Sequence, residues 1–184
     1  MILFLDSIAS LPEFSIIKDN KIIYSEKIII DNQHKMSDSI IPSYFSLEKK
    51  LLLKDKLSLL ITNTGPGSYT ALRIGIAFLS GLGLSKNIEL IGISCIDLIS
   101  FIIKNANLST TAMFIVSSNN QKFICFYNQF DNEFKIEKVD NNNIFVNPKI
   151  DSVKQIFTND KKELLNQNIK KKIVIKEIHF NELV

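Results

Sequence analysis

The chain has 184 residues, enough for one large domain or two small ones, and 46% of them are hydrophobic, which excludes a mainly disordered protein. The net charge of +3 comes from 22 basic and 19 acidic residues. The lysines are scattered apart from Lys170–Lys172, so the charge does not indicate a dedicated nucleic-acid surface. No apolar run approaches the ~20 residues of a membrane span, and the apolar start has no charged region before it, so we expect a cytoplasmic protein.

The amino-terminal segment predicts one strand followed by a hairpin. Ile2–Leu5 is an apolar run that ends at Asp6. Phe14–Lys18 and Lys21–Ile30 have the composition of two further strands, joined by Asp19-Asn20, a favourable hairpin turn.

A polar loop and a helix are predicted next. Residues 31–38 are polar and loop-like, and His34 within them is expected to be exposed to solvent. Apolar residues then follow helical spacing and predict a helix over 39–53. Pro42 is tolerable only near the first turn of that helix.

A glycine turn between a strand and a long helix is the most distinctive local feature. The run Leu57–Ile61 predicts a buried strand, and the apolar segment around Ala71–Leu84 is long enough for a helix. Gly65 and Gly67 permit backbone angles that other residues avoid. The hydroxyl of Ser68 or Thr70 is suited to cap the helix, whose first N–H groups also favour an anion.

Two nucleotide-binding motifs fail at this turn. A P-loop requires Gly and Lys where this chain has Thr70 and Ala71. A dinucleotide fingerprint requires a third Gly, again at Thr70, and an acid at the end of the next strand, whereas Glu89 opens that strand. A tight turn without a ligand is the plainer interpretation.

The helix after the turn is apolar nearly all round, which predicts burial on more than one side. It contains several small residues that permit close packing of a second helix, namely Ala71, Gly75, Ser80, Gly81 and Gly83. Glycine costs about 1 kcal/mol relative to Ala in a helix, so this number of glycines indicates a packing requirement. The neighbouring helix belongs either to the same chain or to another subunit.

Strand Ile88–Ser94 and helix Cys95–Lys104 close the first half, and the polar segment 105–111 is the expected boundary. We therefore predict two halves, 1–106 and 107–184. The second half is expected to contain strands at 112–116, 123–130 and 134–139, a short helix at 151–157 and a final strand at 172–180.

The sequence shows little catalytic chemistry. His34 and His179 are far apart and have no partner one helical turn away, so no metal site is predicted. Cys95 and Cys125 lie in apolar runs and are interpreted as buried thiols in preference to a disulfide. No pair of carboxylates indicates an acid–base site.

Three segments resemble the bacterial TsaB (YeaZ) family. They are Gly65-Pro-Gly-Ser-Tyr-Thr-Ala-Leu-Arg-Ile-Gly75, Gly81-Leu-Gly-Leu84 and Ile91-Gly-Ile-Ser94, which compare with the family's GPGSFTGLRIG, aGLa and vGvSsL motifs. The first segment departs by Tyr69 for Phe and Ala71 for Gly. The opening Ile2–Ser7 is similar to the family's first strand, ILaIDTS.

The resemblance implies an α/β fold of the actin-like, ribonuclease H-like (ASKHA) class, in two halves with the second shortened. It implies a subunit that is not itself an enzyme, binds no cofactor, and dimerises with a catalytic TsaD-like subunit. With a TsaE-like ATPase, that complex transfers a threonylcarbamoyl group to the adenosine beside the anticodon of tRNA. The tRNA would be reached indirectly, through the complex, and the family also forms homodimers through the same face.

By the same resemblance, the partner interface involves the turn and the start of the helix: Gly65, Gly67, Ser68, Tyr69, Thr70, Ala71, Arg73 and Gly75. Arg73 is the one charge within the apolar helix, so it either makes a polar contact across the interface or extends to solvent. We predict that Gly75→Leu abolishes the interface and leaves a folded monomer.

Two departures keep alternatives open. Ile8 stands where the family has a hydroxyl, and the segment 116–123 lacks the family's Asp, Arg and Glu. In actin-like enzymes an acid at the position of Asp6 helps to hold metal and phosphate, whereas here it is interpreted as a turn cap. The alternatives are a degenerate kinase or peptidase, and a free-standing homodimer with weak nucleotide binding.

Overall fold

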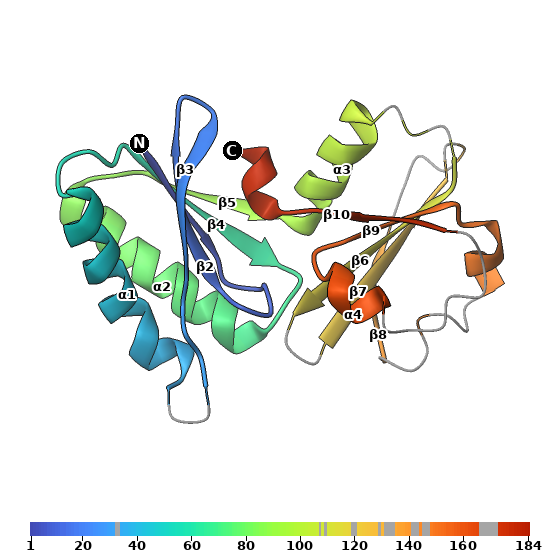
Figure 1. Cartoon of the computed structure of the whole chain (residues 1–184), viewed down its shortest axis with the longest axis horizontal. Helices are drawn as coiled ribbons and strands as arrows, with labels where there is room; N and C mark the ends of the chain where they lie inside the picture. Colours follow the sequence, from blue (N-terminus) through green and yellow to red (C-terminus); the bar gives the residue numbers. More distant parts are fainter. Residues whose placement is uncertain are drawn as a thin grey trace.

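Two five-stranded sheets of matching topology organise the part of the chain that the structure describes. The computed structural model describes residues 1–31, 34–106, 108, 110–118, 121–128, 130, 135–140, 144, 148–165 and 173–184. The strand orders are β3-β2-β1-β4-β5 and β10-β9-β6-β7-β8. Counted along the chain, the first three strands of each sheet pair antiparallel. The fourth and fifth strands run parallel to the first. Figure 1 shows the two sheets at opposite ends of the molecule.

The first sheet follows the sequence closely. Its strands are β1 (Ile2–Asp6), β2 (Glu13–Lys18), β3 (Lys21–Lys27), β4 (Leu59–Gly65) and β5 (Leu90–Ser94). The predicted hairpin is confirmed, because Asp19 and Asn20 both have φ in the left-handed region, at 52° and 57°. This conformation suits a tight hairpin turn between twisted strands.

Helices α1 (Met36–Leu51) and α2 (Tyr69–Lys86) cover one face of this sheet, side by side (Figure 1). Their inward residues pack with alternate residues of the strands, including Leu3, Leu5 and Leu60. The helix that packs beside α2 thus belongs to the same chain. The rings of Tyr44 and Phe78 meet edge to face at 5.4 Å, and Lys86 forms an ion pair with Glu48 at 2.8 Å.

The predicted start of α1 at residue 39 is wrong by one turn. The helix begins at Met36, because Asp38 accepts a hydrogen bond from the Lys35 backbone N–H at 3.3 Å and so caps the first turn. Pro42 therefore lies in the second turn, where it removes one helical hydrogen bond. His34 is exposed, as predicted, and its Nδ1 lies 3.0 Å from Asp31.

The second sheet consists of β6 (Ala112–Ser118), β7 (Gln121–Tyr127), β8 (Ile136–Val139), β9 (Gln155–Thr158) and β10 (Val174–Glu177). The helix predicted at 151–157 is wrong. A 3₁₀ helix covers Pro148–Ser152, and β9 follows it, pairing between β6 and β10. Residues 131–134, which include the start of the strand predicted at 134–139, and residues 170–172 lie outside the described residues.

The connections of the second sheet are short. Helix α4 (Lys161–Leu165) has 5 residues where α2 of the first sheet has 18. The fold is therefore the predicted α/β class, with a shortened second half.

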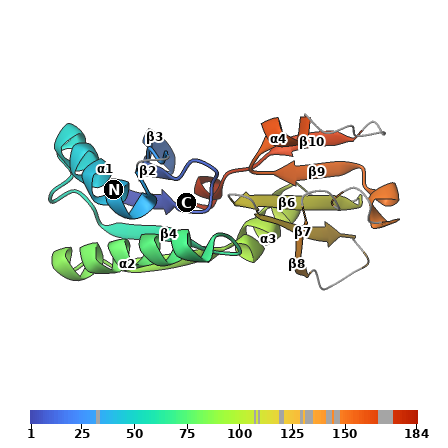
Figure 2. The same ribbon diagram turned by 90° about the horizontal axis from the view of Figure 1, so that it is seen from below.

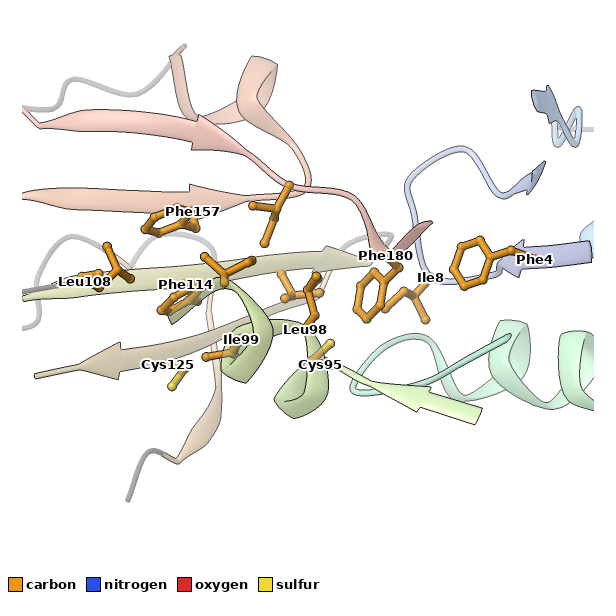
Figure 3. Packing of buried hydrophobic residues seen from close by; sticks show 14 of the residues in the cluster. Phe4, Ile8, Cys95, Leu98, Ile99, Leu108, Phe114, Cys125, Phe157 and Phe180 are labelled. Atoms are coloured by element: carbon orange, nitrogen blue, oxygen red, sulfur yellow. The ribbon is translucent and has the colours of Figure 1, made fainter. Parts of the chain in front are cut away.

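One hydrophobic cluster joins the two sheets. Helix α3 (Cys95–Asn105) lies on the face of the first sheet opposite α1 and α2, and packs with residues of both sheets. Figure 2 shows α3 at the junction, with the chain's carboxyl end beside it. Phe180 of the terminal 3₁₀ helix (Phe180–Leu183) is fully buried, together with Ile8 and Phe4 on one side and Phe114 and Phe157 on the other (Figure 3). The boundary near residue 106 stays a prediction.

Candidate functional site

The glycine turn lies against the loop that follows β1. Gly65 has φ +108°, a conformation that favours glycine, and Ser68 caps α2 by accepting from the Ala71 N–H at 3.4 Å. A side chain at Gly67 would place its Cβ 2.3 Å from Ile8 Cγ2. Only glycine therefore fits at this position beside the buried Ile8.

Asp6 is held within its own loop. Its Oδ1 accepts hydrogen bonds from the backbone N–H groups of Ile8 and Ala9, at 3.1 and 3.0 Å, and from Asn63 Nδ2 at 2.6 Å. Burial raises the pKa of the Asp6 carboxyl, although these hydrogen bonds oppose that effect. Asp6 thus caps the turn, as interpreted from the sequence, and Ser7 donates to Asn63 Oδ1 at 2.8 Å in the same network.

The turn also contacts the second sheet. The backbone N–H of Ser68 donates to Ser118 Oγ, at the end of β6, at 2.9 Å. The loop after β1, the glycine turn and the end of β6 therefore meet directly. Cys95, the first residue of α3, contacts the glycine turn, with its thiol 3.9 Å from the Pro66 carbonyl oxygen.

A polar groove opens beside Asp6, between the two sheets. It has a volume of about 240 Å³, and its charged residues are Asp6, Glu13, Asp160, Glu177, Lys27, Lys162 and His179. This volume is below the usual range of small-molecule pockets, and carboxylates outnumber lysines. Among the described residues, this excess of carboxylates does not favour a triphosphate with its four negative charges, and Ile8 fills the space against Gly67.

Several residues predicted at the partner interface face this chain's own core. A Cβ at Gly75 would lie 3.1 Å from Leu5 and Ser7, and Ala71 is buried against the same sheet. The Gly75→Leu prediction is therefore wrong in its physical basis, because the substitution would disrupt the monomer. A Cβ at Gly83 would likewise lie 2.8 Å from the Ile88 carbonyl oxygen.

Other small residues of α2 point outward. A Cβ at Gly81 would meet nothing within 4 Å, and Ala77 is exposed one turn earlier. The Arg73 guanidinium stacks on the ring of Tyr69 at 4.8 Å, and Tyr69 is 71% exposed. In the single chain Arg73 is exposed, so the alternative that it extends to solvent holds for this state.

An exposed apolar face results. We define the outer face as the following exposed residues of α1, its carboxyl end and α2: Ile41, Phe45, Leu52, Tyr69, Arg73, Ala77, Gly81 and Leu84. Leu84, Leu52 and Phe45 are exposed by 86%, 70% and 60%. Helix α2 was expected to be buried on more than one side. It is covered by the sheet and by α1, and its remaining side is exposed.

The sequence missed the α1 part of this face. Ile41 and Phe45 lie one turn apart on α1 and are exposed, whereas Ile40, Tyr44 and Leu47 are buried; the exposed Leu52 follows at the end of the helix. Two apolar stripes on one helix were the available signal.

Neither thiol is set up for reaction. Cys95 and Cys125 are free and buried, as predicted, and burial raises the pKa of both thiols, that of Cys125 to about 11. Among the described residues, His, Cys, Asp and Glu form no group suited to hold a metal ion. No helix in the described part of the chain has both the length and the apolarity to span a bilayer.

The fold defines the class of protein. Two structures share it at low identity: YeaZ from Pseudomonas aeruginosa, with 13% identity and a TM-score of 0.59 over 99% of this chain and 87% of that one, and a Bacteroides thetaiotaomicron protein described as having an actin-like ATPase fold and unknown function, with 8% identity and a TM-score of 0.52 over 96% and 90%. The chain thus has the actin-like α/β fold.

The family follows from the sequence. The model of the family described as TsaD, tRNA N6-adenosine threonylcarbamoyltransferase, matches residues 33–182. The chain belongs to this family. A comparison with curated proteins gives no match.

Proposed function

We propose that this chain is a non-catalytic subunit of the machinery that makes N6-threonylcarbamoyladenosine in tRNA. It would dock through its outer face on the catalytic, TsaD-like subunit of the same cell and support that subunit's activity. The observation that carries the proposal is the outer face itself. Large exposed apolar patches on small proteins mark interaction sites, and here the exposed residues come from α1 and α2. These two helices lie side by side (Figure 1).

The outer face has the composition of an interface. Its exposed aromatic residues, Phe45 and Tyr69, and the stacked Arg73 belong to residue types that dominate binding energy at protein interfaces. The exposed Gly81 and Ala77 permit a partner helix to approach closely. A groove of about 590 Å³ extends the face at the carboxyl end of α1, where Phe45 and Leu52 line it together with charged side chains.

The junction between the sheets supports the non-catalytic role. Ile8 occupies the space beside Gly67, Asp6 is engaged by its own loop, and the groove beside it is acidic. These contacts leave Asp6 poorly placed for the metal and phosphate binding of active actin-like proteins. Under the proposal, nucleotide chemistry belongs to the TsaD-like subunit and to a TsaE-like ATPase in the cytoplasm, and tRNA is reached through the complex.

The test is reconstitution of tRNA modification. The TsaD-like and TsaE-like proteins of the same genome would be assayed on a tRNA transcript with and without this chain, and with its Gly81→Leu variant. We expect modification to require the wild-type chain and to fall at least tenfold with Gly81→Leu. ATP hydrolysis by this chain alone would support the degenerate-kinase alternative, and modification without the chain would contradict the proposal.

A further inference from the structure

The charges around the outer face are unbalanced. Helix α2 contains Arg73 and Lys86 and no Asp or Glu along its whole length. At the carboxyl end of α1, the groove beside Phe45 and Leu52 is lined by Lys49, Lys54 and Lys56. The apolar centre of the face therefore lies between a cation at one end and a lysine cluster at the other.

The nearest carboxylates are largely engaged within the chain. Glu48 pairs with Lys86 at 2.8 Å and accepts from the Tyr44 hydroxyl at 2.9 Å, and Lys86 in turn holds the pKa of the Glu48 carboxyl below its usual value. Asp38 caps the first turn of α1. Among the described residues of the groove, Asp55 is then the remaining acid, against three lysines.

Self-association through this face would oppose like charges. A two-fold dimer places the same patch on both sides of the contact, so Arg73 would face the apolar or basic part of a second copy. Within the described part of the chain, the interaction of Arg73 is its stacking on Tyr69, without a hydrogen bond or ion pair. Covering it without a carboxylate costs free energy. A second copy provides no acid on α2 to compensate.

We infer that the outer face selects an acidic helix of a different protein over a second copy of this chain. The inference rests on the proposed function, since it specifies the partner of that same face. Arg73 lies near the start of α2, whereas the groove lysines lie at the carboxyl end of α1, beside the end of α2. The matching helix has apolar and small residues in its centre and carboxylates near both ends.

The experiment measures two affinities against salt. Self-association would be measured by sedimentation at about 50 and 500 mM salt, which brackets strong and weak screening of surface charges. Binding to the TsaD-like protein would be measured under the same conditions. The variants are Arg73→Glu, which reverses a charge on the outer face, and Lys138→Glu, which makes the same reversal at an exposed site of β8.

We expect salt to weaken the heterologous complex and to leave self-association unchanged or stronger. Arg73→Glu should weaken the heterologous complex about tenfold and strengthen self-association, whereas Lys138→Glu should change neither. Arg73 is exposed, so circular dichroism should show an unchanged fold.

Two outcomes overturn the inference and leave the proposed function standing: a heterologous complex that is insensitive to salt and to Arg73→Glu, and a homodimer that is tightest at low salt. Absence of any complex with the TsaD-like protein at either salt concentration contradicts the proposed function. In that case, self-association that is absent or that salt strengthens still shows that like charges oppose a second copy, and a homodimer that is tightest at low salt overturns the inference as well.

Discussion

Gly67 and Ile8 form the contact that closes the junction between the sheets. A Cβ at Gly67 would lie 2.3 Å from Ile8 Cγ2 and 3.1 Å from Ser118 Oγ, and Ile8 is fully buried. We predict that Gly67→Ala lowers the free energy of unfolding by about 1–3 kcal/mol, because the core must shift to admit one methyl group. The penalty should be smaller in an Ile8→Ala background, as urea denaturation of the four proteins would show. Equal penalties in both backgrounds would contradict the contact.

Asp6 gives a prediction about pH. Because burial raises the pKa of its carboxyl above the ordinary 3.8, the folded protein retains a proton that the unfolded chain has released. The contribution of Asp6 to stability is therefore greatest below 3.8 and is lost as the pH rises through the folded-state pKa. Asp6→Asn keeps an oxygen for the Ile8, Ala9 and Asn63 donors and removes the charge.

We expect Asp6→Asn to raise the free energy of unfolding at neutral pH, with the difference vanishing in acid. Thermal unfolding from pH 3 to pH 8 is the measurement, and the exposed Asp55→Asn is the control. Lower stability of Asp6→Asn at neutral pH would mean that the ionised carboxylate stabilises the loop.

Substitutions at two glycines of α2 are expected to change stability in opposite directions. Gly75 packs on Leu5 and Ser7, so Gly75→Leu should destabilise the fold by several kcal/mol or prevent folding. Gly81 faces open space, so Gly81→Ala should stabilise the helix by up to about 1 kcal/mol. Chemical denaturation of both variants tests the assignment, and a loss of stability in Gly81→Ala would contradict it.

At the residue scale, the sequence predicted the local roles of side chains better than the direction in which each residue of a helix points. Ser68 as helix cap and Asp6 as turn cap are confirmed by their hydrogen bonds. The small residues of α2 were recognised, but periodicity alone does not tell which face meets a sheet. Gly75 and Gly81 differ by six positions, and only the packed structure shows that they point in different directions.

At the scale of the elements, helix α1 has a proline, Pro42, inside its helical span. Pro42 is exposed in the second turn, where a residue with an N–H would complete a hydrogen bond to the Asp38 carbonyl oxygen. We predict that Pro42→Ala raises the free energy of unfolding by about 1–3 kcal/mol. Urea denaturation measures the change, with the exposed Ser46→Ala as the control. Equal stability of Pro42→Ala and wild type would show that the helix tolerates the missing bond without cost.

Long elements with a clear period were predictable, and short ones were not. Helix α2 and strand β1 appear where the apolar runs place them, within a few residues. Strand β9 has four residues, three of them buried, so it shows neither the period of a strand nor that of a helix. Its identity comes from pairing with β6 and β10, which are distant in the sequence.

At the scale of the molecule, two sheets of the same strand order are joined by one hydrophobic cluster, and each sheet has a further cluster of its own. The carboxyl-terminal residues Ile178 and Phe180 belong to the cluster that contains Phe4 and Ile8, so the second half is tied to the first at both ends of the chain (Figure 3). The segments that carry the family resemblance all lie between residues 2 and 94, so the arrangement of the second half had to come from the structure.

The central claim is that the outer face docks this chain on a catalytic partner. The most direct measurement is the mass, by light scattering, of an equimolar mixture of this chain and the TsaD-like protein of the same genome. We predict the mass of a one-to-one complex with the wild-type chain and separate components with Gly81→Leu. Separate components with both proteins, or an equally stable complex with both, would contradict the claim.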